Sequence, residues 1–102
     1  MIFIEDRDFQ KRCKGLLDDD ELFALMTWLA VSPGAGKIIP GSGGLRKFRW
    51  AAKGHGKRGG ARVIYFWWMA DDRILLLDIY AKSGQENLAA DEIKKLRQKI
   101  IL

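Results

Sequence analysis

Residues 62–80 read RVIYFWWMADDRILLLDIY, and this stretch decides the fold. Arg62 to Met69 is apolar almost throughout, and so is Ile74 to Tyr80. Apolar runs of this length are typical of central strands that are covered on both faces. Asp71-Asp72 lies between the two runs and indicates a tight turn. The stretch therefore predicts two neighbouring antiparallel strands at the centre of a sheet.

The segment before this pair predicts a third strand, one face of which is cationic. Leu45 to Ala52 alternates as a strand does, so that every second side chain shares a face. One face takes Lys47, Arg49, Ala51 and Lys53, and the other takes Arg46, Phe48 and Trp50. A glycine-rich turn at 54–60 (GHGKRGG) then leads into the central pair. The three strands are expected to form an antiparallel meander.

One further strand and two helices are expected before the meander. Ile2 to Ile4 predicts an edge strand, and Phe9 to Leu17 predicts a short polar helix. Asp18 to Asp20 supply an N-cap and a negative first turn for a second helix. Its apolar face recurs at helical spacing as Leu22, Leu25, Met26 and Leu29, and Ser32-Pro33-Gly34 ends it. The stretch 33–44 is rich in glycine and holds both prolines, which predicts a loop.

The chain ends in another predicted helix. Ser83-Gly84-Gln85-Glu86 has the spacing of a capping box, and Ile93, Leu96 and Ile100 mark one apolar face. The element order is then βααβββα. We expect one α+β domain over residues 1–102, with a small, mainly antiparallel sheet, helices on one face, and the other face free for chemistry.

The charge of the chain is concentrated in its middle third. The 102 residues carry a formal net charge of +5. Residues 1–32 hold seven acids against four bases, and residues 71–102 hold six of each. Residues 33–70 hold eight bases and no acid, with aromatic residues among them. Because cations hold phosphates and aromatic rings stack on bases, this pattern favours a nucleic-acid partner.

Composition excludes several other classes. The longest apolar run, Val63 to Ala70, is far shorter than the roughly 20 residues of a membrane helix. The first residues lack a signal-peptide pattern, so we expect a cytoplasmic protein. Cys13 is the only cysteine, which rules out an internal disulfide. It is expected to be a small, partly buried apolar residue without a role.

The usual catalytic constellations are not evident. Metal-dependent nucleases need converging carboxylates, but the basic third has none, so we expect no metal or other cofactor. Gly36-Lys37 is followed by Ile38 and not by Ser or Thr, which argues against a phosphate loop. His55, the only histidine, lies between glycines in the turn, so it is only a reserve candidate for proton transfer.

RNA cleavage can proceed without a metal or a histidine. The 2′-hydroxyl of the substrate attacks the adjacent phosphate, and the protein orients the backbone, moves two protons and stabilises the added negative charge. Lys47, Arg49, Lys53 and Arg62 form a group that can do this. Crowded like charges favour the neutral form of a lysine, which makes it a better base.

These features resemble the RelE/HigB toxins of bacterial type II toxin–antitoxin systems. The resemblance rests on the element order, on 43–49 (GGLRKFR), on the turn 53–60 (KGHGKRGG), on 62–65 (RVIY) and on 79–82 (IYAK), and it is strongest with a HigB-like branch. It implies a microbial-ribonuclease-like fold and an mRNA endonuclease that works in the ribosomal A site. It also implies a cognate antitoxin, which we expect to be a HigA-like helix-turn-helix protein.

The resemblance assigns roles to individual residues. Lys47 and Arg49 match a basic pair on the second strand of the family, Arg62 matches an arginine that opens the third, and Lys82 matches a lysine at the strand exit. Lys53 joins this catalytic set from the strand alternation alone. The predicted RNA contacts are Arg46, Trp50, Lys57 and Arg58. The chain departs from the family at Ser83, where an arginine is frequent, and at Leu88 and Ala89, where a tyrosine occurs.

Two other functions remain open at this point. A ParE-like toxin would share the fold and inhibit DNA gyrase, but such relatives lack a concentrated cationic sheet face. A passive RNA-binding module would suit the basic, aromatic-rich middle equally well. Either alternative would leave translated mRNA uncut, so cleavage is the property that separates them from an mRNA interferase.

Overall fold

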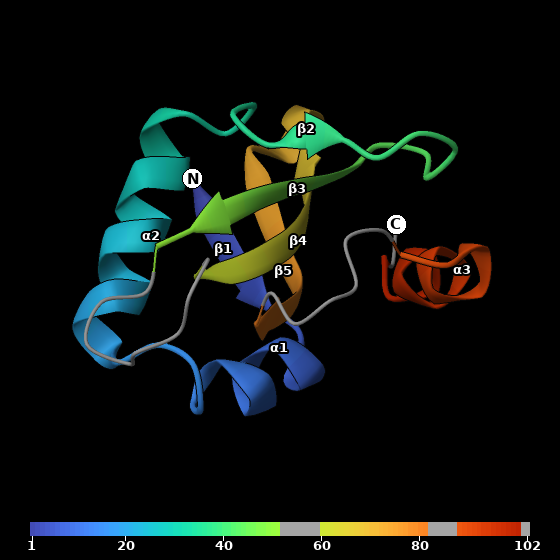
Figure 1. Ribbon diagram of the computed structural model, residues 1–102. Helices are drawn as coiled ribbons and strands as arrows, with labels where there is room; N and C mark the ends of the chain where they lie inside the picture. Colours follow the sequence, from blue (N-terminus) through green and yellow to red (C-terminus); the bar gives the residue numbers. More distant parts are fainter. Residues whose placement is uncertain (52–59, 82–87, 101–102) are drawn as a thin grey trace.

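The computed structural model describes residues 1–51, 60–81 and 88–100 (Figure 1). A small sheet lies at the centre, with helices placed around it. In chain order the elements are β1 (Ile2–Glu5), α1 (Arg7–Cys13), α2 (Asp19–Val31), β2 (Lys37–Ile38), β3 (Leu45–Trp50), β4 (Ala61–Trp68), the short 3-10 helix η1 (Met69–Asp71), β5 (Arg73–Ala81) and α3 (Ala90–Gln98).

The sheet has the strand order β1-β5-β4-β3-β2. β3, β4 and β5 form the predicted antiparallel meander, and β1 runs parallel to β5 at one edge. The predicted α+β, mainly antiparallel architecture is therefore confirmed. One strand was not predicted. The loop expected over 33–44 contains β2, which pairs antiparallel with β3 at the other edge.

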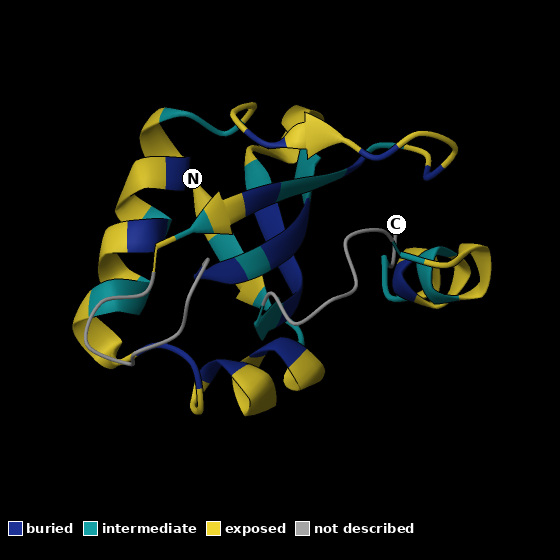
Figure 2. Cartoon of the chain, in the orientation of Figure 1, coloured by how far each residue is buried: buried dark blue, intermediate teal, exposed yellow. Residues whose placement is uncertain are grey.

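Short-range capping explains where the first two helices begin. The Asp6 carboxylate accepts a hydrogen bond from the backbone N–H of Asp8 at the start of α1. At the start of α2, Asp18 and Glu21 form a reciprocal capping box, in which each side chain accepts from the other residue's backbone N–H. α2 turns Leu25 and Leu29 toward the sheet, while most of its outer side is exposed (Figure 2).

Two apolar clusters lie on opposite faces of the sheet because alternate residues of β4 and β5 point in opposite directions. The first packs α1 and α2 against one face, and its buried members include Phe9, Leu29 and Tyr65. The second cluster lies on the other face, where Leu96 of α3 packs with Ile64. Figure 1 shows α3 on the side of the sheet away from α2.

The position of α3 corrects the expectation that the helices share one face. Only α1 and α2 do so. The outer face carries its own apolar residues, Leu45, Ile64, Leu75 and Leu77, and α3 together with Ile39 shields them from water. Since burial of apolar surface drives packing, this end of the outer face requires a cover. The free surface is therefore smaller than predicted and lies at the other end of the strands.

A β-bulge in β5 divides the outer face into these two ends. Ile64 pairs with Asp78, whereas the next residue of β4, Tyr65, pairs with Leu76, so Leu77 is an extra residue on β5. The bulge lets the apolar Leu77 and the polar Asp78 both belong to the outer face, because it shifts the alternation by one residue. Polar residues of β5 can thus follow apolar ones on the same face.

The C-terminal helix begins later than its sequence pattern predicts. Residues 83–86, which carry the predicted capping box, lie outside the described residues. Leu88 and Ala89 are not helical, and α3 begins at Ala90. Glu92 caps it, because its carboxylate accepts a hydrogen bond from the backbone N–H of Ala89 at 3.1 Å. Within the described residues, no helix is long and apolar enough to cross a membrane.

Candidate active site

The open end of the outer face presents a row of polar side chains across three strands. Arg49 of β3 pairs with Arg62 of β4, and Arg62 pairs with Tyr80 of β5. Side chains of directly paired residues lie on the same face, with Cβ atoms about 4.5–5.5 Å apart. The strand register thus brings the predicted residues Arg49 and Arg62 together, and it adds a tyrosine beside them.

A second row lies next to the first. Lys47 precedes Arg49 by two residues on β3, so both side chains lie on the outer face. Lys47 pairs with Lys37 on β2 in one direction and with Ile64 on β4 in the other. Ile64 is itself a buried member of the second cluster. The two rows therefore occupy the strip that α3 leaves uncovered.

The four cations of these rows line one open pocket of about 320 Å³, whereas Tyr80 lies beside it and packs partly against the second cluster. The described lining of this pocket consists of Ala35, Lys37, Lys47, Phe48, Arg49 and Arg62, and it includes no acid. Lys37 and Lys47 are directly paired like charges that repel each other, and an anion bound between them relieves that repulsion. The pocket is chemically suited to the phosphates of a nucleic-acid backbone, with arginine able to bind one phosphate through two parallel hydrogen bonds.

Tyr80 is the polar group of the row without a positive charge. Burial raises the pKa of its hydroxyl above the usual value near 10, and this effect exceeds the opposing effect of the nearby Arg62 charge. The hydroxyl therefore keeps its proton throughout the neutral range. A neutral phenol beside a guanidinium can donate a hydrogen bond or a proton to an oxygen that becomes negative.

The opposite face of β3 has a structural role, which involves Arg46. The Arg46 guanidinium donates hydrogen bonds to the carbonyls of Gly34 and Gly36, at 3.1 and 2.8 Å. It also lies 5.9 Å from the ring centre of Trp67. Arg46 thus fastens the segment before β2 to the sheet. Its predicted contact with RNA stays a prediction, and the structure does not bring it into the pocket.

Trp50 lies on the same inner face and packs against α2. Its ring centre is 5.9 Å from that of Trp28, which also contacts Phe48 at 5.0 Å. The structure therefore places Trp50 in the aromatic packing under α2 and outside the pocket. Four predicted site residues, Lys53, Lys57, Arg58 and Lys82, lie outside the described residues, as does His55.

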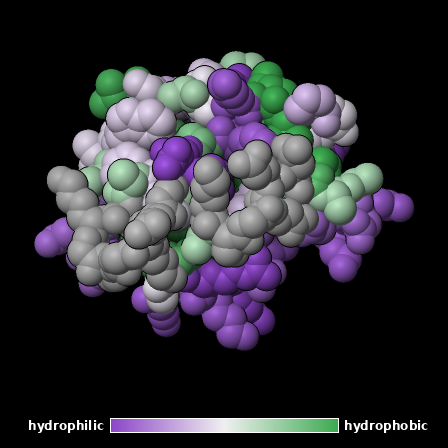
Figure 3. All heavy atoms as spheres, viewed as in Figure 1, coloured by the Kyte–Doolittle hydropathy of each residue, from purple (hydrophilic) through white to green (hydrophobic). Residues whose placement is uncertain are grey.

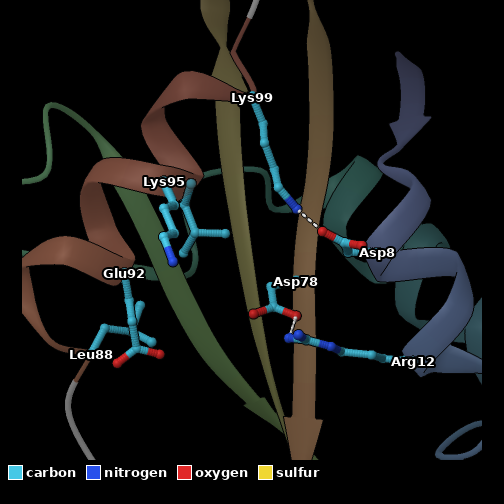
Figure 4. A pocket seen from close by; sticks show the side chains of 8 residues that line it. Asp8, Arg12, Asp78, Leu88, Glu92, Lys95 and Lys99 are labelled. Carbon is cyan, nitrogen blue, oxygen red and sulfur yellow. Dashed lines mark hydrogen bonds and ion pairs between the residues drawn. The ribbon is translucent and has the colours of Figure 1, made fainter.

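α3 forms the border of the candidate site and is fastened by ion pairs. The Lys99 ammonium donates to the carboxylates of Asp6 and Asp8, at 2.8 and 2.6 Å. Below it, Arg12 of α1 donates to Asp78 of β5 at 2.6 Å. Figure 4 shows a different pocket between these ion pairs, with α3 on one side, α1 on the other and Asp78 between them. Hydrophilic residues gather over α1 and α3 in Figure 3.

Two residues of the site were missed by sequence reasoning. Lys37 lies in a segment whose composition predicts a loop, because two strand residues between glycines and a proline give no periodic pattern. Tyr80 ends a strand that its sequence predicts to be buried, and only the bulge at Leu77 shows which face its side chain is on. The one available signal was that Lys37 is the sole charged residue between Pro33 and Leu45.

The remaining nucleophile of the chain lies away from the pocket. Cys13, the last residue of α1, is buried, and burial raises the pKa of its thiol to about 11. The sequence predicts a small, partly buried apolar residue here, and Cys13 is buried more completely than that, with 4% of its surface exposed. Across residues 1–51, 60–81 and 88–100, no three metal-ligating side chains come together.

Comparison with known proteins decides the family. A profile described as "RelE toxin of RelE / RelB toxin-antitoxin system" matches residues 2–100. The chain belongs to the RelE toxin family. A structure of E. coli toxin RelE, a double arginine-to-alanine mutant in the free state, superposes with a TM-score of 0.63 at 17% identity. That match covers 99% of this chain and 97% of the E. coli chain.

Membership of this family indicates which activity the chain has. RelE-family toxins are endoribonucleases that cleave mRNA, act on the ribosome and pair with an antitoxin. The structural likeness to E. coli RelE shows the shared fold. The pocket on β2, β3 and β4 brings Lys37, Lys47, Arg49 and Arg62 together.

Proposed function

We propose that this RelE-family toxin cleaves translated mRNA in the A site of the small ribosomal subunit, and that the RNA's own 2′-hydroxyl is the nucleophile. The observation that carries the proposal is the row formed by Arg49, Arg62 and Tyr80 across β3, β4 and β5. The row has two permanent cations and one partly buried, protonated hydroxyl on the same face of the sheet. A transesterification at phosphorus needs groups of these two kinds.

Arg62 is the proposed ligand of the scissile phosphate because it is the central member of the row. One of Lys47, Arg49 and Lys53 acts beside it, a lysine by taking the proton of the 2′-hydroxyl or the arginine by stabilising the charge that develops. The 2′-oxygen bonds to phosphorus, the bond from phosphorus to the 5′-oxygen breaks, and that oxygen takes up a proton. The products are a 2′,3′-cyclic phosphate and a 5′-hydroxyl end.

Tyr80 is the proposed proton donor to the leaving 5′-oxygen. It lies directly across from Arg62, and its raised pKa keeps the hydroxyl protonated. Lys82, which the family resemblance suggests for this neighbourhood, stays a predicted member of the catalytic set, and so does Lys53. Lys57 and Arg58 stay predicted contacts to the RNA backbone.

The proposal includes a partner and a place. The family pairs with an antitoxin. We propose a HigA-like helix-turn-helix protein for this chain, because the sequence motifs quoted above resemble the HigB-like branch. Translating ribosomes place the activity in the cytoplasm. Three cations of the pocket lie on β2 and β3, near the β2 edge of the sheet, where an acidic or strand-adding antitoxin segment can bind.

Primer extension on a translated mRNA tests the proposed function. The wild-type chain is expected to give cuts at codon positions that appear only when ribosomes are present. Arg62→Ala is expected to remove these cuts while the protein stays folded. Ribosome-dependent cuts by Arg62→Ala at the wild-type rate would contradict the assignment of the scissile phosphate to Arg62.

A gyrase supercoiling assay with the same preparations distinguishes the alternative toxin activity. The proposal expects supercoiling to be unaffected at concentrations that stop translation. Inhibition of gyrase by a chain that leaves mRNA intact would place it with ParE-like toxins. Binding of RNA without cleavage, with and without ribosomes, would instead make it a passive RNA-binding module.

A further inference from the structure

Lys37 occupies a position in the site that the proposed reaction does not use. It is exposed, and it lies on β2, whose two residues pair with Lys47 and Arg46 of β3. Because Lys37 and Lys47 are directly paired, their side chains lie on the same face of the sheet. Both also line the pocket that contains Arg49 and Arg62. Directly opposed like charges destabilise a strand pair, so this arrangement has a cost in the absence of a ligand.

Buried contacts hold the segment before Lys37 in place in spite of that cost. The Tyr65 hydroxyl, which lies in the core, donates to the carbonyl of Pro33 at 2.7 Å and accepts from the backbone N–H of Gly36 at 2.9 Å. Arg46 donates to two carbonyls of the same segment. A Cβ atom at Gly36 would lie 2.7 Å from a ring carbon of Tyr65, so only glycine fits there. Lys37 is therefore positioned by a built structure.

The two pairs of cations form two successive steps along β3. One step is Arg49 with Arg62, and the other is Lys37 with Lys47. Residues two apart on a strand are separated by about 6.4–6.8 Å, which is comparable to the spacing of neighbouring phosphates in an extended nucleic-acid strand. The steps are also chemically different, since arginine binds a phosphate in a fixed geometry while lysine acts as a mobile point charge.

We propose that Lys37 and Lys47 form a second phosphate subsite, which binds the RNA backbone phosphate next to the scissile one, so that Lys47 serves this subsite and Arg49 or Lys53 serves the scissile phosphate with Arg62. The inference rests on the proposed function for the identity of the first phosphate. Its ligand is a phosphodiester of single-stranded RNA. The described lining of the pocket contains no acid that would compete for the two ammonium groups. The subsite sets the direction and register of the strand, because two phosphates define a line where one does not.

Chain-length dependence of RNA binding tests this subsite without any cleavage. NMR titrations of the labelled protein with 2′-O-methylated dinucleotides and trinucleotides compare one phosphodiester with two. For the wild-type chain, the second phosphodiester is expected to raise the affinity several-fold, up to about tenfold, as a charge-assisted contact does. For Lys37→Ala the trinucleotide should gain only what its extra base contributes. Lys94→Ala, an exposed lysine of α3 outside the pocket, is the matched control and should behave as wild type.

Neutral linkages separate the phosphate from the extra base. A trinucleotide in which one of its two linkages is a methylphosphonate should lose the gain with the wild-type chain, and the same replacement should cost Lys37→Ala nothing further. The negative slope of log affinity against log salt should also become shallower by about 0.7 in Lys37→Ala, which is the contribution of one phosphate contact with a single strand.

Three results would overturn the subsite. One is the absence of any gain from the second phosphodiester in the wild-type chain. Another is an equal loss from the methylphosphonate in wild type and Lys37→Ala. The third is unchanged RNA binding by Lys37→Ala together with weakened antitoxin binding, which would make Lys37 part of the protein interface. Because no ribosome and no cleavage are involved, failure of the proposed function appears separately, as ribosome-dependent cleavage that survives Arg62→Ala.

Discussion

The two faces of β3 contain the same kinds of residue and use them differently. On the inner face Arg46 donates to backbone carbonyls and lies near Trp67. On the outer face Arg49 lines an open pocket with Lys47 and Arg62. The difference teaches that a cationic strand does not by itself mark a binding surface. What an arginine can do depends on the groups that its face of the sheet places within reach.

The largest expected effect concerns the centre of the outer face. Arg62→Ala is expected to slow ribosome-dependent mRNA cleavage by at least about 100-fold, since it removes a charge that stabilises the transition state. The melting temperature should stay close to wild type, because the side chain is only partly buried. Single-turnover cleavage rates and thermal melts of the same preparation check both halves. A drop in melting temperature that accounts for the lost activity would contradict the catalytic role.

The two tyrosines give a sharper version of the same comparison. Tyr80→Phe keeps the ring but removes the proposed proton donor, so cleavage should fall by about 100-fold with little change in stability. Tyr65→Phe removes the partner of Pro33 and Gly36 in the core. It should cost about 1–3 kcal/mol of unfolding free energy, and it should affect cleavage only through β2. Denaturant unfolding and cleavage assays on both variants measure these effects. Equal losses of stability in the two variants would contradict the distinction between a catalytic Tyr80 and a structural Tyr65.

How much of this could be predicted from sequence differs between the two faces. The meander follows from long apolar runs, and the alternation over Leu45 to Trp50 correctly separates Lys47 and Arg49 from Arg46. Those are local patterns, and local patterns determine faces. β2 has only two residues, and its identity depends on contacts with Tyr65 and Arg46 that lie far along the chain, so no local signal predicts Lys37 as a site residue.

The C-terminal half of the outer face shows the same limit. The apolar face of the last helix can be predicted from Leu96 and its neighbours. The surface of the sheet on which this helix packs cannot be predicted in the same way. That surface exists because the bulge at Leu77 turns both apolar and polar residues of β5 outward. A bulge is one extra residue in a register between strands, and register is a property of pairs of segments that neither segment encodes alone.

The attachment of α3 should depend on pH. The hydrogen bond from Lys99, and then its charge, lower the pKa of Asp8 below its ordinary 3.8. A carboxyl pKa that is lowered by folding stabilises the folded form at pH values above the ordinary pKa. This contribution is lost as the pH falls through the lower pKa of the folded form. The protection of the α3 amides against hydrogen exchange, relative to an unfolded chain at the same pH, should therefore decrease as the pH falls below about 3.8. Lys99→Met should show faster exchange already at neutral pH and less of this acid dependence.

The matched control for this prediction is Lys94→Met, which changes an exposed lysine on the same helix. It should keep the acid dependence of the wild-type chain. At the alkaline end, burial lowers the pKa of Lys99, but its hydrogen bonds to Asp6 and Asp8 raise it more, above 10.5. That contribution is present below 10.5 and is lost as the pH rises through the folded value. Identical acid profiles for Lys99→Met and wild type would show that the ion pairs do not fasten α3.

The smallest expected effect concerns the reactivity of the Cys13 thiol at the end of α1. With a pKa of about 11, Cys13 is about one part in a thousand thiolate at pH 8. Alkylation of the native protein should therefore be slow, and it should become fast in denaturant. Mass spectrometry after a timed pulse of iodoacetamide measures this directly. Rapid labelling in the folded state would show that the inner face is open near α1.

The most direct test of the division of labour on β3 pairs Arg46→Ala with Arg49→Ala. Both variants remove one arginine from the same strand, and cleavage on ribosomes and the melting temperature are measured for each. Arg49→Ala should lose cleavage by at least about tenfold more than Arg46→Ala, whereas Arg46→Ala should have the lower melting temperature. The reverse pattern, with cleavage dependent on Arg46 and stability dependent on Arg49, would contradict the account.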